Sequence, residues 1–360
     1  MREKLLGAIL ALTVISASAQ TCSQRLVQAE RDYENGRLQS IPDNIGDCFG
    51  RRDGDFSKEE RIRAYRLLTL VHIFTDNEPE AERSLISLLR VDPEHQLDER
   101  VDPAELRLLY NQFQTRPIFR IGFRAGINTS FPQVMDSFTA SDANFDNKFY
   151  NGRGGVENQD AAGVRRIGFN GEVTYEQYFK AGLEGVAGLQ VRASSYDVDN
   201  FFNDPFFNNN ITNSQVYARL PIMARYTLNY DKRGGFQPYG LIGLSYDFLI
   251  SARYVNATRR GGSQFTLADN VDLLASNQVN RHNASFIAGI GLRFPVQTHF
   301  LTAEFRYEKS FFNYIDEDNR YSNQSINFDL GHVEDNLRLD FLSLTIGYTL
   351  SIYNPKRLNN

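Results

Sequence analysis

The spacing of apolar residues changes once along the chain, near Pro117. Before this point they recur at steps of three and four, as in Leu67, Leu68 and Val71, which indicates amphipathic helices. After it they alternate with polar residues, as in the segment 119–127, which indicates strands with one apolar and one polar face. The pattern therefore predicts a helical part followed by a β part.

The helical part shows two marked helix starts. Ser57 with Glu60 has the spacing of a capping box, in which each residue hydrogen-bonds the backbone of the other. Asp102 precedes Pro103, which places an N-cap and a first-turn proline in their preferred order. We expect short helical hairpins over residues 22–114.

One of these hairpins resembles a tetratricopeptide-type repeat. Residues 62–93 match the spacing of that family at Tyr65, Leu68, Ala81, Leu85, Leu88 and Pro93. Thr69 and His72 replace its usual Gly and Tyr. A plain helical hairpin is the alternative, and either structure offers a protein-binding surface rather than a reaction site.

Eight segments after Pro117 follow the two-residue period. They are 119–127, 167–179, 183–195, 216–228, 236–252, 286–294, 301–307 and 342–352. The connections between them alternate in length, and the long ones are 128–164, 196–214, 254–283 and 310–337. Long outer loops and short periplasmic turns are typical of membrane barrels, whereas a soluble β-sandwich has no reason to segregate them. The expected fold is α+β multidomain, a TPR-like helical domain followed by an eight-stranded antiparallel transmembrane β-barrel.

The polar face of these strands carries seven basic and six acidic residues. They are Arg120, Arg124, Glu172, Glu176, Glu184, Arg192, Arg219, Arg225, Asp247, Arg293, Glu304, Arg306 and Glu308. Side chains fill the interior of an eight-stranded barrel, and an unpaired buried charge costs several kcal/mol. We therefore predict a lumen closed by ion pairs, and neither a diffusion pore nor a proton path.

The composition agrees with a barrel. The mean hydropathy is -0.42, and apart from the first residues no apolar run approaches the roughly 20 positions that a spanning helix needs. A helical membrane protein is thereby excluded. The chain holds 27 Phe and 18 Tyr but no Trp, a bias towards residues that favour strands.

The first residues have the order of a secretory signal. Arg2 and Lys4 precede an apolar stretch that ends in a small-residue motif, so cleavage is expected between Ala19 and Gln20. A lipid anchor on Cys22 is an alternative, although Thr21 before it is not a usual small residue. The expected division is 1–19 signal peptide, 20–116 periplasmic helical domain, 117–353 outer-membrane barrel and 354–360 periplasmic tail.

Cys22 and Cys48 are the only cysteines of the chain. Both lie in the exported part, where an oxidising compartment permits a disulfide. The bridge would close a loop of about 27 residues and contribute roughly 3 kcal/mol. Two free thiols or a redox pair are the alternatives, but no Cys-x-x-Cys motif supports a redox pair.

The five histidines have no ligand spacing, so we expect no metal and no other cofactor. The alternative function is a lipid A-modifying hydrolase with a Ser/His site at the rim of the barrel. His282 with Ser285 would be one candidate pair, and His332 with Ser325 and Asp329 another. A histidine at the rim is more often a solvated loop residue, so the prediction is that the protein is not an enzyme.

The four predicted outer loops are acidic, with sixteen acids against six bases. They also contain the pairs Phe201–Phe202, Phe206–Phe207 and Phe311–Phe312. Such pairs suit docking to a partner or a glycan, or else fold the loops into a cap. A Ca²⁺ site at Asp316–Asp318 lacks the spacing of a known motif. The expected partners are other envelope proteins and outer-membrane lipid, and not nucleic acid.

Three stretches carry a family resemblance. Leu220–Tyr226, Gln237–Gly243 and the closing strand Leu342–Tyr353 resemble the PorT-like outer-membrane barrels of bacteria with a type IX secretion system. The resemblance implies an eight-stranded barrel with a closed lumen. It also implies an accessory role in an envelope or secretion assembly. The helical domain and the tail after Tyr353 depart from the family pattern.

Overall fold

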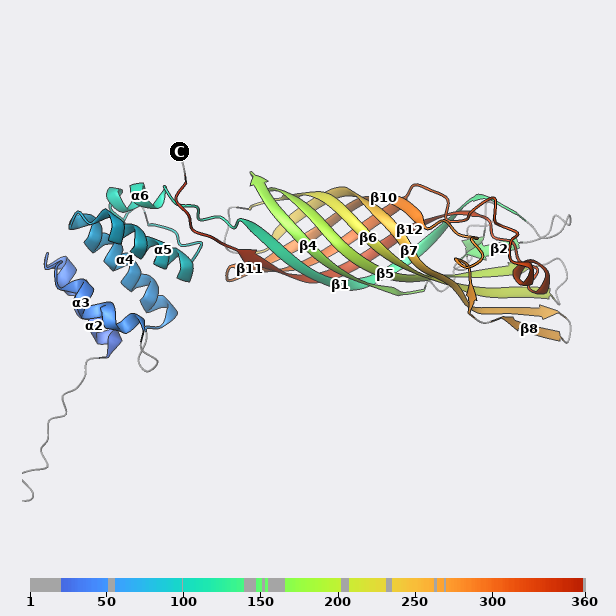
Figure 1. Ribbon diagram of the computed structural model, residues 1–360, viewed down its shortest axis with the longest axis horizontal. Coiled ribbons are helices and arrows are strands. Elements are labelled where there is room, and N and C mark those ends of the chain that lie inside the picture. Colours follow the sequence, from blue (N-terminus) through green and yellow to red (C-terminus); the bar gives the residue numbers. More distant parts are fainter. Residues whose placement is uncertain are drawn as a thin grey trace, which may run out of the picture. The chain divides into compact units, whose positions relative to one another are not determined.

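The computed structural model describes residues 21–50, 56–98, 100–138, 147–150, 153–154, 166–201, 207–230, 235–261, 264–268 and 270–358. The chain divides into two compact units. One is the helical unit, residues 1–116 with 353–360, and the other is the barrel unit, residues 117–352 (Figure 1). The expected cleavage site between Ala19 and Gln20 lies outside the described residues.

The helical unit contains five α-helices and one short 3₁₀ helix among its described residues. They are α2 (Cys22–Glu34), α3 (Ile41–Gly46), η1 (Asp47–Phe49), α4 (Lys58–Phe74), α5 (Glu78–Val91) and α6 (Ala104–Tyr110). α4 and α5 pack against each other as a hairpin. The capping box of Ser57 and Glu60 is confirmed at the start of α4.

The predicted cap at Asp102 is wrong. α6 begins at Ala104, and its N-cap position is Pro103. Asp102 is 6% exposed, and its carboxylate accepts hydrogen bonds from Arg66 Nε at 2.7 Å and from the backbone N–H of Asp98 at 2.6 Å. The ion pair with α4 therefore holds the carboxylate away from the helix start.

The C-terminal residues belong to the helical unit. The backbone N–H of Gln114 donates to the Lys356 carbonyl at 2.9 Å, and that of Leu358 donates to the Gln112 carbonyl at 2.6 Å. The side chain of Arg357 pairs with Glu82 of α5. The segment expected to be a tail is thus part of this unit, and the chain passes between the two units twice.

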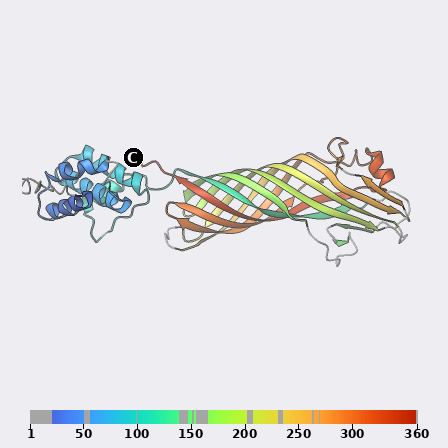
Figure 2. The ribbon, with the colours of Figure 1, turned by 90° about the horizontal axis from the view of Figure 1, so that it is seen from below.

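Eight long antiparallel strands form the barrel unit (Figures 1 and 2). They are β1 (Phe119–Asp136), β4 (Gly168–Lys180), β5 (Leu183–Phe201), β6 (Phe207–Thr227), β7 (Gln237–Gly261), β10 (His282–Val296), β11 (His299–Ser310) and β12 (Asn336–Ile352). Each pairs with the next along the chain, and β12 pairs with β1, which closes the barrel. The short strands β2 (Asn147–Tyr150), β3 (Arg153–Gly154), β8 (Gln264–Ala268) and β9 (Val271–Asp272) extend this sheet.

The predicted alternation in length is confirmed for three of the four long connections, which span residues 137–167, 262–281 and 311–335, whereas the predicted long loop 196–214 is reduced to residues 202–206. Residues 181–182, 228–236 and 297–298 join strands at one end, here called the turn end, where the chain also enters and leaves the barrel. The first turn needs two left-handed residues, Ala181 with φ 49° and Gly182 with φ 81°. The opposite end is called the loop end.

The predicted strand boundaries at the loop end are wrong. Most of residues 196–214 and 254–261 continue β5, β6 and β7 instead of forming loops. β7 alone has 25 residues, more than twice the about 9–11 that cross a membrane. In these extensions the inward side chains change from charged to apolar, as between Arg192 and Tyr196 of β5.

Apolar side chains cover the outside of the barrel over its middle and turn-end part. Ile222, Ile290 and Ile346 are each 67–68% exposed, as suits residues that face lipid. Among the described residues, no helix combines the length and the apolar character needed to cross a membrane.

Candidate functional site: the barrel interior and its loop end

Thirteen charged side chains point into the barrel, and each takes part in at least one ion pair. All are at most 9% exposed. The ion pairs divide them into two groups. The inner network, nearer the turn end, contains Arg120, Arg124, Glu172, Glu176, Glu184, Arg225, Arg293, Glu304 and Arg306. The quartet, nearer the loop end, contains Arg192, Arg219, Asp247 and Glu308.

Glu176 of β4 lies at the centre of the inner network. Its Oε1 is 2.5 Å from Nη2 of Arg124, and its Oε2 is 2.7 Å from Nη1 of Arg225. Nη2 of Arg293 lies 3.3 Å from the same Oε2. One carboxylate is therefore shared by three guanidinium groups from three strands, which stabilises charges that could not be buried singly.

Glycines make room for these long side chains. A Cβ at Gly347 of β12 would stand 2.5 Å from Cγ of Arg124, and a Cβ at Gly291 of β10 would stand 2.3 Å from the ring of Tyr239. Both distances are too short for a real contact. These positions thus accept only glycine while the neighbouring side chain keeps its place.

The quartet is held by polar neighbours. Nε of Arg219 donates to Asp247 Oδ1 at 2.6 Å, and Nη1 donates to Gln190 Oε1 at 2.6 Å. Asp247 also accepts hydrogen bonds from the hydroxyl groups of Ser245 and Ser285. Arg219 and Asp247 are thus fixed by groups on adjoining strands, whereas Glu308 pairs with Arg192 and Arg219 across the barrel.

Aromatic rings separate the quartet from the loop end. The guanidinium of Arg192 lies 4.4 Å from the ring centre of Phe341, and that ring packs edge-on against Tyr217. Beyond these rings the interior holds an apolar core, together with buried polar side chains such as Asn213 and Gln215. We call this apolar core the cap. Its strand residues include Tyr196, Val198, Ile211, Leu249, Tyr254 and Leu337, and its loop residues include Leu273, Leu274, Val279, Tyr314, Ile315, Ile326 and Leu330.

A small polar cluster lies buried within the cap. Nζ of Lys148 donates to Asp335 Oδ1 and to the carbonyl of Val333, both at 2.7 Å. The hydroxyl of Tyr254 donates to Glu334 Oε1 at 2.6 Å. These bonds fix the segment that precedes β12 to β2 and β7.

His332 sits beside this cluster. It is fully buried, its Nε2 lies 3.7 Å from Oε1 of Glu334, and its ring packs edge-on against Tyr254. Burial opposes ionisation of Glu334, but the contacts with His332 and Tyr254 outweigh it. The pKa of the Glu334 carboxyl therefore lies below its ordinary value.

The geometry does not assemble the predicted Ser/His pairs. His282 is exposed on the outer face of β10, with Nδ1 2.5 Å from the Tyr246 hydroxyl, whereas Ser285 is buried on the inner face and bonds Asp247. Residues three apart on a strand point to opposite faces, so they cannot form a dyad. Neither ring nitrogen of His332 has a hydrogen-bond partner among the described residues, Ser325 included.

The exposed phenylalanines of the loops do not form the cap. Phe311 and Phe312 are 49% and 57% exposed and pack edge-on against each other. They follow β11 directly in sequence. Within the described ranges, no three acidic, His or Cys side chains are placed to hold a metal ion. The side chains of Phe201, Phe202, Phe206 and Phe207 lie outside the description.

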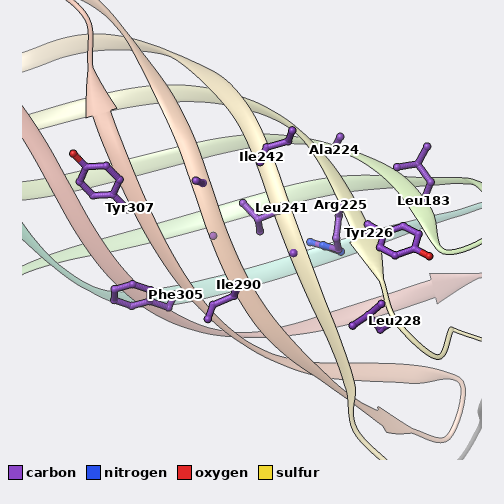
Figure 3. Close-up of a pocket in the computed structure, with 13 residues that line it drawn as sticks. Leu183, Ala224, Arg225, Tyr226, Leu228, Leu241, Ile242, Ile290, Phe305 and Tyr307 are labelled. Atoms are coloured by element: carbon purple, nitrogen blue, oxygen red, sulfur yellow. The ribbon is translucent and has the colours of Figure 1, made fainter.

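The outer surface of the barrel contains an apolar hollow of about 720 Å³. Three small residues, Ala224, Gly240 and Ala288, line it together with larger side chains from five strands, among them Leu183, Ile242 and Phe305 (Figure 3). Arg225 reaches it only with its stem, because its guanidinium lies inside the barrel. The hollow belongs to the surface that faces lipid.

In the helical unit, the predicted disulfide between Cys22 and Cys48 is formed. It connects the start of α2 to η1, beside an apolar core that α2, α3 and α4 share. Burial lowers the pKa of His72 on α4 below its ordinary value, against the opposing charge of Glu80.

The residues that form the cap are absent from the sequence-based prediction. Tyr196, Val198 and Tyr254 fall in segments that were expected to be loops. One signal was available in the sequence. Every second residue of β5 faces inward, and this alternation continues past the charged Arg192 to the apolar Tyr196 and Val198. The cluster of Lys148 and Asp335 joins residues 187 positions apart, which no local pattern reveals.

Comparisons with known proteins concern the barrel. The family described as "Outer membrane protein beta-barrel domain" matches residues 111–316, more than half of the chain. No curated protein matches significantly. OprG from Pseudomonas aeruginosa is similar in structure, with 10% identity, 66% of this chain and 98% of OprG covered, and a TM-score of 0.34. Neisserial surface protein A is similar with 12% identity, coverage of 64% and 95%, and a TM-score of 0.28.

Proposed function

The chain belongs to the outer membrane protein β-barrel domain family and lies in the outer membrane, and from this premise we propose that it is a non-enzymatic anchor. The barrel holds the helical unit at the membrane, and the helical unit binds other envelope proteins. The function thus resides on surfaces outside the lumen.

The observation that carries this proposal is the filled lumen. Thirteen buried charged side chains form ion pairs within the inner network and the quartet, and the cap fills the interior at the loop end. A channel would need a continuous path lined by hydrated groups. Side chains occupy that path here.

The proposal places the helical unit in the periplasm. Short turns of membrane barrels face the periplasm and long loops face outward. Residues 117 and 352, where the chain enters and leaves the barrel, are both at the turn end. The helical unit continues from this end, and an oxidising periplasm suits its disulfide.

We further propose a role as an accessory or structural subunit of an envelope or secretion assembly of the type IX kind. The resemblance of residues 220–226 and 237–243 to PorT-like barrels supports it. A helical hairpin of tetratricopeptide type, formed by α4 and α5, would supply the binding surface.

Two surfaces suit partner binding. On the helical unit, the large apolar side chains of Val27 and Phe74 are 41% and 47% exposed and so are accessible to a partner. At the loop end, Phe312 and Phe328 are 57% and 75% exposed within an acidic surface. We assign envelope partners to the first surface and an outer partner to the second.

Photo-crosslinking in living cells tests these assignments. A photoreactive phenylalanine analogue replaces Phe74 or Val27 in one set of variants and Phe328 in another. We expect discrete protein adducts from Phe74 and Val27, identified by mass spectrometry. The matched control is Ile346, which faces lipid and should give no protein adduct.

The outcome at each position is interpretable by itself. If Phe74 and Val27 yield no more protein adduct than Ile346, the helical unit is not a partner-binding unit and the proposal fails. Adducts from Phe328 alone would move the function to the loop end.

A further inference from the structure

The two most exposed large apolar side chains described in the helical unit are close in sequence, on α6 and just before it. Leu108 is 67% exposed and Val101, just before the helix, is 65% exposed, both above any other large apolar residue described in this unit. Ala104, Leu108 and Asn111 share one face of α6, because they are four and three residues apart. We call Val101, Ala104 and Leu108, together with Leu97, the α6 patch.

The α6 patch borders a hollow rather than a flat surface. The hollow has a volume of about 540 Å³ and is lined by Gln96, Leu97, Ala104, Arg107 and Leu108, among others. The stem of Arg107 runs along it, and Nε of this residue has no hydrogen-bond partner among the described residues. An apolar stripe with an arginine at its margin is the composition of helices that lie on a lipid surface.

The length of the connection limits how far this patch can lie from the start of the barrel. Only residues 111–118 separate α6 from β1. Even fully extended, the path from Tyr110 to Phe119 spans at most about 30 Å. Phe119 stacks on Tyr175, with ring centres 5.4 Å apart, at the turn-end border of the apolar belt. The second passage of the chain, at residues 352–353, tethers the unit again.

We propose that the α6 patch binds the phospholipid surface that surrounds the turn end of the barrel. The inference goes beyond the proposed function, and it requires only that the barrel lies in a membrane. Charge does not drive this contact, because Asp98 and Glu105 offset Arg100 and Arg107 nearby. The driving force is therefore burial of the exposed Leu108 and Val101 among acyl chains.

A phospholipid surface fits better than a protein partner. A protein could bind any accessible face of the unit, whereas lipid requires the apolar face to lie within reach of the bilayer. The α6 patch meets that requirement, because it is next to the connection in sequence. Phe74, at the end of α4, lies 45 positions before Phe119.

The absence of Trp from the chain permits a clean test. Leu108→Trp in the full-length protein introduces a single Trp, and the protein is reconstituted in phosphatidylcholine vesicles with or without brominated acyl chains. We expect a blue-shifted emission and about a twofold or greater loss of intensity with brominated lipid. Val101→Trp provides a second exposed site with the same expectation, in case one variant fails to fold.

Two controls bracket the measurement. Phe74→Trp, in the same unit, should show water-exposed emission and no quenching by brominated lipid. Ile346→Trp, on the lipid-facing wall, should be quenched strongly. If both patch variants match Phe74→Trp, the proposal is overturned. Shielding of the patch from an aqueous quencher without quenching by brominated lipid also overturns it, because it indicates a protein contact.

This experiment uses purified protein without partners. A lack of lipid quenching would therefore leave the cross-linking result at Phe74 unaffected, and a lack of cross-links would leave the lipid contact unaffected. The two proposals fail independently.

Discussion

The inner face of the barrel has opposite chemistry in its two halves. Over the membrane part, the interior holds thirteen charges while the exterior is apolar. At the loop end, the interior is built around the apolar cap, with a few buried polar side chains such as Lys148 and Asp335 within it. The same strands run through both parts. On β7, Ile242 and Leu244 face outward and are exposed, whereas Tyr254 and Ala257 face inward and are buried.

This inversion shows which solvent each part is built for. In lipid the outer wall must be apolar, so polar groups gather inside and must pair with one another. In water the outer wall is polar, and apolar side chains are buried inside instead. The change between Arg192 and Tyr196 on β5 therefore marks where the barrel leaves the membrane.

The largest expected effect is in the inner network. Glu176→Gln removes the negative charge that three arginines share, and we expect a loss of about 3–5 kcal/mol in the free energy of unfolding. Urea unfolding in detergent, followed by heat-modifiable migration on a gel, measures it. Glu59→Gln on the exposed start of α4 is the control and should change stability by less than about 0.5 kcal/mol. A change below about 1 kcal/mol for Glu176→Gln would show that this ion-pair network is not what stabilises the membrane part.

The cap should respond locally. Leu249→Ala empties a fully buried position, and we expect a local loss of about 2–5 kcal/mol. Hydrogen exchange of residues 311–337 should rise while heat-modifiable migration stays unchanged. Its neighbour Ile250→Ala is the matched control, because that side chain faces outward and is 51% exposed. Equal exchange in the two variants would contradict a separate apolar core at the loop end.

The pH dependence of the cap follows from Glu334. Its pKa is lower in the folded than in the unfolded state, so its contribution to stability is complete above the ordinary value of about 4.3. The contribution is lost as the pH falls through the lower folded value. Hydrogen exchange of residues 330–337 should therefore increase below about pH 4. Glu334→Gln should remove this component, and an identical pH profile in the variant would exclude Glu334 as its source.

The smallest effect is expected in the helical unit, which serves as a reference outside both halves of the barrel. Burial lowers the pKa of His72, so the folded state binds its proton less readily than the unfolded state. The contribution of neutral His72 to the stability of α4 is then complete above the ordinary histidine pKa of about 6.5, and it decreases as the pH falls below that value. Amide hydrogen exchange of α4, measured between about pH 7.5 and pH 5, follows this change because histidine titrates in that range. His72→Gln should give a flatter profile, and a slope equal to that of the native protein would reject the assignment.

The sequence predicted the membrane part of the barrel closely. Strict alternation placed all thirteen lumen charges on the inner face, because parity alone decides the face of a strand. It did not predict the loop end. β7 carries register shifts opposite Val216/Tyr217 and Thr212/Asn213 of β6, and each added residue changes which face later side chains occupy. Counting every second residue from the outward-facing Ile242 would therefore place Ala252 and Tyr254 on the outer face, whereas both are buried inside.

The helical unit shows a similar division. The capping box at Ser57 was predictable because its two residues are three positions apart, and the disulfide because Cys22 and Cys48 are the only cysteines of the chain. The role of Asp102 was not predictable. Its partner Arg66 lies 36 positions away, and the ion pair with Arg66 takes the place of the expected N-cap hydrogen bond at the start of α6. The pairing of Leu358 with Gln112 was likewise hidden from any local pattern.

The sequence by itself determined the two parts of this protein, the strand number and the inward set of charges, since helix and strand periods are local and fix which face a side chain occupies. Only the tertiary structure decided how those charges divide into the inner network and the quartet. It also decided that strands beyond the membrane close over an apolar cap, and that the last residues join the helical unit. These features depend on contacts between segments that are distant in sequence, and such contacts form only in the folded chain.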